Sequence, residues 1–104
     1  MLNALKKLFS SAPQTAFDKL HKNGAQIIDV RTPGEFQQGH IKGSVNIPLQ
    51  VLPNQTSKIK KGKPIILCCA SGMRSASAKS ILVSKGFTEV YDGGGWTSLQ
   101  NKIN

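Results

Sequence analysis

The chain has 104 residues, a net charge of +9 and only two cysteines. This length fits one domain with a core of its own, and a hydrophobic share of 38% argues against a disordered or fibrous protein. The two cysteines are adjacent, which argues against a disulfide between them, because neighbouring side chains of a strand point to opposite faces.

Residues 1–13 are predicted to form a short amphipathic segment, separate from a main domain at 14–104. Lys6 and Lys7 interrupt its apolar residues, so we expect neither a signal peptide nor a stable membrane anchor. Unpaired cysteines are typical of a reducing compartment. The expected location is therefore the cytoplasm.

The first half of the main domain alternates apolar runs with turn residues, which predicts short helices and buried strands. The expected elements are a helix at 15–21 with Thr15 as its N-cap and Gly24 beyond its end, a strand at 25–30, a turn with a short helix at 31–40, a strand at 44–49, and a short helix with a basic turn at 50–62.

The second half repeats this alternation and contains the most apolar strand of the chain. The expected elements are a strand at 64–69, a helix at 75–87 with Ile81, Leu82 and Val83 facing inward, a strand at 89–92, a tight turn at 93–95 and a final helix at 96–103.

Strands that alternate with helices predict an α/β fold of three layers, with a central parallel sheet of four to five strands and helices on both faces. Such sheets bind ligands at the carboxyl ends of their strands. The stretch CCASGMRSA, residues 68–76, occupies this position, because it joins the strand at 64–69 to the helix that follows.

This stretch has the composition of a thiolate site. Small residues and Gly72 allow the loop after Cys69 to curl, so that its backbone N–H groups and the start of the next helix face one point. A cysteine held there has its pKa lowered from ~8.5 towards ~3.5–7.5, and the thiolate is the nucleophile. Arg74 can then bind an oxyanion on the substrate, whereas Cys68 is expected to point into the core.

Other chemistries have weaker support. His21 and His40 are isolated, so we expect no metal site and no cofactor. Most lysines are scattered, and the cluster at 58–63 has no interleaved aromatic residues, which argues against nucleic-acid binding. The basic surface would still attract small anions.

Three stretches resemble the rhodanese family of thiosulfate sulfurtransferases, in its single-domain form. They are IIDVRTPGEFQQGHIKGSVNIPL (27–49), the loop CASGMRS (69–75) and KGFTEVYDGGGW (85–96). The resemblance implies that Cys69 accepts a sulfane sulfur as a persulfide and passes it to cyanide or a thiol. In this family the loop cradles the sulfur and its arginine binds thiosulfate.

The resemblance also assigns supporting roles. It makes Asp29, Arg31 and Glu35 structural residues, with Arg31 as the expected partner of Glu35, and makes His40 a turn and packing residue. The residues implied to bind substrate are Ala70, Ser71, Gly72, Met73, Arg74 and Ser75.

The same loop is compatible with other functions. Related phosphatases use a Cys-x₅-Arg loop, whereas the spacing from Cys69 to Arg74 is Cys-x₄-Arg, which suits a sulfur atom better than a phosphate. A persulfide relay with an acidic protein partner and a non-catalytic interaction module are the competing functions. We expect a monomer.

Overall fold

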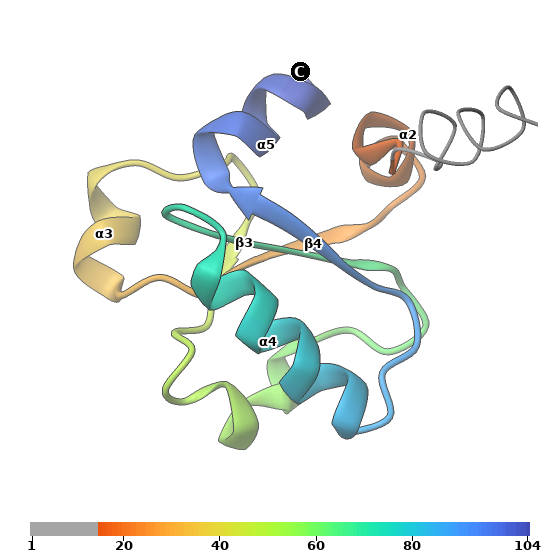
Figure 1. Ribbon diagram of the computed structural model, residues 1–104. Helices are drawn as coiled ribbons and strands as arrows, with labels where there is room; N and C mark the ends of the chain where they lie inside the picture. The colour runs from red at the N-terminus through yellow and green to blue at the C-terminus, as the bar shows by residue number, and fades with distance from the viewer. Residues whose placement is uncertain (1–14) are drawn as a thin grey trace, which may run out of the picture.

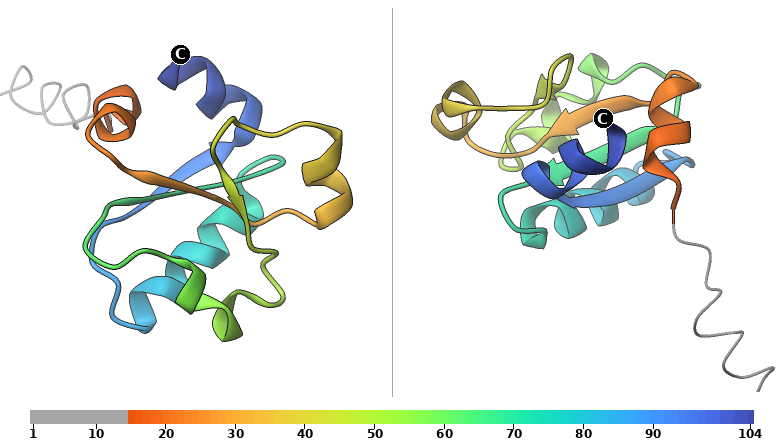
Figure 2. Two further views of the ribbon diagram at one scale, coloured as in Figure 1. Left: turned by 180° about the vertical axis from the view of Figure 1, so that it is seen from behind. Right: turned by 90° about the horizontal axis from the view of Figure 1, so that it is seen from above.

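The computed structural model describes residues 15–104, so the predicted segment at 1–13 lies outside the described residues. The described chain forms a parallel sheet of four strands in the order β2-β1-β3-β4. Helix α4 covers one face, and α2 and α5 cover the other (Figures 1 and 2). This confirms the predicted three-layer α/β fold. The strands are β1 (Gln26–Asp29), β2 (Val45–Asn46), β3 (Ile65–Cys69) and β4 (Val90–Gly95), and the helices are α2 (Phe17–Lys22), α3 (Pro33–Gln38), α4 (Met73–Ser84) and α5 (Trp96–Ile103).

Strand β3 is buried along its whole length and supplies both faces of the core. Ile65, Leu67 and Cys69 point towards α4, whereas Ile66 and Cys68 point towards α2 and α5. Full burial of each such aliphatic side chain stabilises the fold by about 1.5–3 kcal/mol. The central strand therefore holds the loop that follows it on a rigid base.

Several predicted boundaries are wrong in detail. Thr15 does not cap α2 with its side chain, because Ala16 is the N-cap and makes no side-chain bond. The strand predicted at 44–49 pairs only over Val45–Asn46, and the helix predicted at 50–62 is two short 3₁₀ turns. Val83 is 51% exposed, so it does not face inward.

The glycine run at 93–95 is not the predicted tight turn, since β4 continues through Gly95. A Cβ on Gly93 would lie 2.8 Å from the carbonyl oxygen of Leu67 and 2.9 Å from a methyl group of Leu99. Only glycine allows β4 to approach β3 and α5 this closely. The glycines thus extend the strand to the level of the loop after Cys69, where β3 and β4 shift register.

Candidate active site

The loop between β3 and α4 turns sharply at Gly72, the N-cap of α4, with φ of +109°. Positive φ at this value strongly disfavours any residue with a side chain. The turn brings the Gly72 N–H back to the end of β3, where it donates a hydrogen bond of 2.9 Å to Cys69 Sγ. The sulfur therefore lies at the base of a closed backbone loop.

Cys69 is only 1% exposed, and burial on its own would raise the pKa of its thiol. The Ser75 hydroxyl and the N–H groups of Ser75, Gly72 and Ser71 oppose this effect. Their hydrogen bonds favour the charged form, so the pKa of Cys69 lies below its ordinary value. This is the direction that a nucleophilic cysteine requires.

Cys68 has the opposite environment, although it is the neighbouring residue. It is fully buried on the other face of the sheet, as the sequence predicts, and both cysteines are free thiols. Burial, followed by the nearby charge of Asp29, raises the pKa of Cys68 to about 12. Cys68 is therefore held as an inert thiol.

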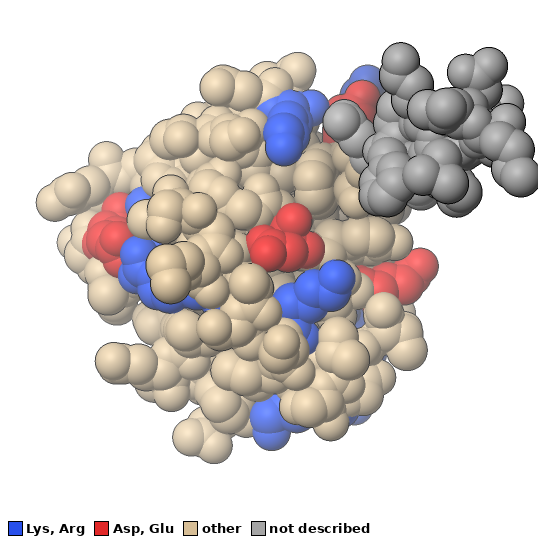
Figure 3. Space-filling model, in the orientation of Figure 1, with Lys and Arg blue, Asp and Glu red and all other residues tan. Residues whose placement is uncertain are grey.

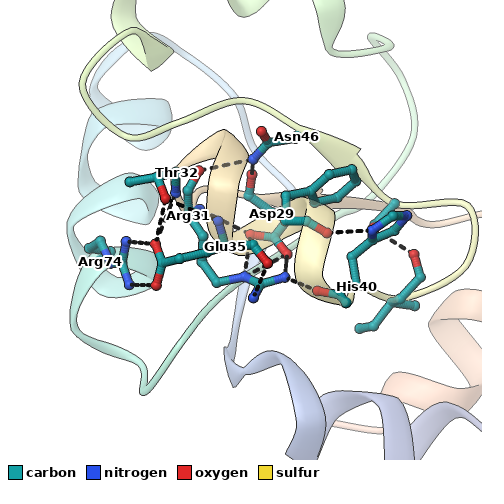
Figure 4. Close-up of polar contacts among 11 residues, drawn as sticks. Asp29, Arg31, Thr32, Glu35, His40, Asn46 and Arg74 are labelled. Carbon is teal, nitrogen blue, oxygen red and sulfur yellow. Dashed lines mark hydrogen bonds and ion pairs between the residues drawn. The ribbon is translucent and has the colours of Figure 1, made fainter.

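Arg74, in the first turn of α4, forms a two-pronged ion pair with Glu35 of α3 (Figure 4). Its Nη1 and Nη2 donate to the two carboxylate oxygens at 2.6 and 2.9 Å. These bonds, with that from the Thr32 N–H, lower the pKa of Glu35 to about 2. The predicted pairing of Glu35 with Arg31 is wrong for the Glu35 side chain, whose partner is Arg74.

Arg31 instead pairs with Asp29, and both side chains are almost completely buried. Its Nη2 donates to Asp29 Oδ2 at 2.7 Å and to the Gly39 carbonyl at 2.7 Å, and its Nη1 donates to the Glu35 carbonyl at 3.2 Å. The guanidinium also lies 4.7 Å from the centre of the Trp96 ring. This network ties α3 to the end of β1, and so holds Glu35 in reach of Arg74 (Figure 4).

His40 makes its contacts within its own segment. Its Nδ1 lies 2.7 Å from the Phe36 carbonyl oxygen, and its ring stacks on the Phe36 ring with centroids 3.7 Å apart. These are the contacts of a turn and packing residue.

One residue beside the loop was missed by the sequence reasoning. Asp92 of β4 accepts a hydrogen bond of 2.6 Å from the Ser75 hydroxyl and one of 2.9 Å from the Gly94 N–H. The available signal was its position, because Asp92 is the last residue of the strand predicted at 89–92 and directly precedes the glycine run. Parallel strands bring their carboxyl ends to one edge of the sheet.

The lysine cluster lies away from this loop. Over the face shown in Figure 3 the positive side chains are scattered. A hollow at the amino ends of β3 and β4, opposite to Cys69, is lined by Lys60, Lys61, Lys63 and Lys85. Within residues 15–104 no three His, Cys, Asp or Glu side chains gather as metal ligands, and no helix there is long and apolar enough to span a membrane.

The sequence matches the family model of the rhodanese-like domain over residues 12–102. It is 44% identical over 80 residues to the uncharacterized protein YqhL of Bacillus subtilis, which covers 76% of this chain and 64% of YqhL. It is 38% identical over 88 residues to the thiosulfate sulfurtransferase GlpE of Stutzerimonas stutzeri, which covers 83% of this chain and 81% of GlpE. The chain thus spans just under two thirds of YqhL and most of GlpE.

Solved structures show the same likeness. A rhodanese with anions from E. coli matches with a TM-score of 0.68 at 34% identity, over 72% of this chain and 91% of that one. The reduced Bacillus anthracis CoADR-RHD matches with a TM-score of 0.71 at 38% identity. That match covers 83% of this chain but 15% of the other, so the similarity concerns a small part of the larger protein.

Proposed function

This chain belongs to the rhodanese family, and we propose that it is a sulfurtransferase that carries a sulfane sulfur as a persulfide on Cys69. The observation that carries the proposal is the bond of 2.9 Å from the Gly72 N–H to the Cys69 sulfur. N–H groups at the start of a helix stabilise negative charge on sulfur. The same groups would also stabilise the charge of a persulfide.

The proposed reaction has two displacement steps. The Cys69 thiolate attacks the outer sulfur of thiosulfate, a sulfur–sulfur bond forms, and the original sulfur–sulfur bond breaks with its electron pair on the departing sulfite. Cyanide or a thiolate then attacks the outer sulfur of the persulfide. That step yields thiocyanate or a new persulfide and returns the Cys69 thiolate.

The loop at 70–75 would hold the transferred sulfur. Its backbone N–H groups, with those that open α4, form a cradle for an anion and are already oriented before the reaction. The Cys-x₄-Arg spacing makes this cradle small. We therefore propose that a single sulfur atom, and not a phosphate group, is the transferred unit.

Arg74 would bind the sulfonate oxygens of thiosulfate. A guanidinium has five N–H groups, and the two bonds to Glu35 leave the others available. The Arg74 side chain is 35% exposed, so a donor can reach it while the ion pair stays intact. Glu35 would thus orient Arg74 for the donor.

The same ion pair motivates a second candidate, a persulfide relay between proteins. Glu35 compensates the charge of Arg74, which weakens the attraction of this site for a doubly charged thiosulfate ion. A donor that brings the sulfur as a protein persulfide needs no oxyanion contact. The net charge of +9 would favour an acidic partner.

Intact-protein mass before and after thiosulfate treatment tests the proposal. We expect the wild-type protein and the matched control Cys68→Ser to gain one sulfur atom that cyanide removes, and Cys69→Ser to gain none. A retained gain in Cys69→Ser would contradict the role of Cys69. If the wild type gains no sulfur from thiosulfate but does so from a persulfidated donor protein, the relay is the better description.

A further inference from the structure

The Ser75 hydroxyl lies between the cysteine sulfur and a carboxylate of a different strand. Its Oγ is 3.6 Å from Cys69 Sγ, 2.6 Å from Asp92 Oδ1 and 3.0 Å from the Gly72 carbonyl oxygen. A hydroxyl has one proton to donate. Ser75 is fully buried, so this proton has only protein acceptors close to it.

Asp92 is held in position for this contact. Its Oδ1 also accepts the Gly94 N–H at 2.9 Å, which orients the carboxylate against its own strand. The distance of 2.6 Å from Ser75 Oγ is that of a strong hydrogen bond to a charged acceptor. Asp92 itself is exposed, so solvent screens its charge at longer range.

The direction in which the Ser75 hydroxyl donates affects the protonation state of Cys69. When Ser75 donates to Asp92, a lone pair of Ser75 Oγ faces the sulfur, and the Cys69 thiol can donate to it. A thiolate has no proton to donate, so the Ser75 hydroxyl stabilises it only by donating its own proton to the sulfur. The thiolate keeps the Gly72 N–H as a donor and gains the Ser75 hydroxyl as a further donor only when that hydroxyl turns from Asp92 to the sulfur.

The other charged or titratable groups around the loop have different partners. Among the residues that the structure describes, Asp92 is the titratable side chain that hydrogen bonds link to Cys69 through Ser75. The remaining groups are Arg74 of α4, paired with Glu35 of α3, the buried Asp29 and Arg31 at the end of β1, and Cys68 on the opposite face of β3.

We propose that Asp92 is a positioning residue for sulfur transfer, which competes with Cys69 for the Ser75 proton and thereby favours the thiol form of the resting cysteine. The inference rests on the proposed function of Cys69. When the thiolate forms, the S–H bond breaks, its electron pair stays on sulfur and its proton goes to solvent. The Ser75 hydroxyl then donates to sulfur, and in the persulfide the inner sulfur likewise has no proton.

The rate of Cys69 alkylation by iodoacetamide, followed as a function of pH by peptide mass, tests this proposal without sulfur transfer. Asp92→Asn keeps the size of the side chain but makes it a weaker, neutral acceptor. We expect its alkylation midpoint, the pH at which the alkylation rate is half-maximal, to fall by about one unit. This is the shift that corresponds to the free energy of one hydrogen bond to a charged group. Ser75→Ala should raise the midpoint, because the thiolate loses a donor.

Two controls separate this mechanism from simple charge repulsion. Glu89→Gln removes a negative charge at the opposite end of the sheet, where Glu89 lines the lysine hollow, and should leave the midpoint unchanged. The double variant Ser75→Ala/Asp92→Asn should match Ser75→Ala to within a few tenths of a unit, since only a screened charge effect remains. If Asp92→Asn folds poorly, Asp92→Ser replaces it.

An unchanged midpoint in Asp92→Asn would overturn the proposal. So would a fall of the same size in the Ser75→Ala background, because the effect would then not pass through Ser75. Persulfide formation from thiosulfate is measured separately on the same variants. If the wild type forms no persulfide but the variants show the expected shifts of the alkylation midpoint, the proposed function is wrong. The role of Asp92 towards the Cys69 thiol would still stand.

Discussion

Substitution of Gly72 by alanine should reduce both stability and reactivity. The alanine Cβ would have room, since the nearest atom is the Gly94 Cα at 3.8 Å, so the cost comes from the backbone φ of +109°. An L-residue in this region costs about 1–2 kcal/mol. If the peptide turns to relieve this strain, its N–H leaves the sulfur. The loss of that bond to a thiolate should raise the Cys69 pKa by about one to two units.

Gly62 provides the matched control, because it has φ of +82° and no atom within 4 Å of an added Cβ, in the turn before β3. Urea unfolding should show that Gly62→Ala and Gly72→Ala each lose about 1–2 kcal/mol. Iodoacetamide alkylation should show a raised midpoint only in Gly72→Ala, together with slower persulfide formation. A Gly72→Ala protein with the stability loss but a wild-type midpoint would refute the view that this N–H stabilises the thiolate.

Three further predictions concern charge and burial. Arg31→Met leaves the Asp29 carboxylate buried without its partner, so urea unfolding should show a loss of about 3–5 kcal/mol; a loss below about 1 kcal/mol would contradict this. The folded-state pKa of Glu35 is lowered to about 2, so its stabilising effect is complete above about pH 4.5 and disappears as the pH falls towards 2. Acid titration should therefore show a steeper loss of stability for wild type than for Glu35→Gln over that range, and parallel curves would contradict it. Because the Cys68 pKa is about 12, native protein at pH 8 should be alkylated only at Cys69, and labelling of Cys68 before unfolding would disprove the burial argument.

The parallel sheet and the order of strands and helices along the chain could be predicted from the sequence, because the strands at the centre are continuous apolar runs. Turn residues predicted helix ends where they act locally: Gly24, expected beyond the end of the first helix, has φ of +98° just after α2. The position of Cys69 at the end of β3 followed from the same local pattern. These features depend on residues close together in the chain.

Contacts between distant segments were less predictable. Arg74 and Glu35 are 39 positions apart, and the sequence alone offered Arg31, four positions from Glu35, as the nearer cation. Burial decides which residues pair. Asp29 is fully buried and forms its ion pair with Arg31, whereas the partly exposed Glu35 pairs with Arg74. The tight turn predicted for the three glycines is wrong because the close approach of Gly93 to Leu67 and Leu99 is set by packing between elements.

The chemistry of the loop therefore depends on residues outside its own motif. The charge of Arg74 is compensated by Glu35, which stays in place because the buried Asp29–Arg31 pair ties α3 to β1. On the other side, the Ser75 hydroxyl donates to Asp92. Asp92 lies beside the loop because Gly93 lets β4 pack closely against β3. A chain with the same Cys-x₄-Arg loop but without these neighbours would have the same cysteine in a different electrostatic field. The reactivity of Cys69 should then depend on the residues of β1 and β4 beside the loop as much as on the loop itself.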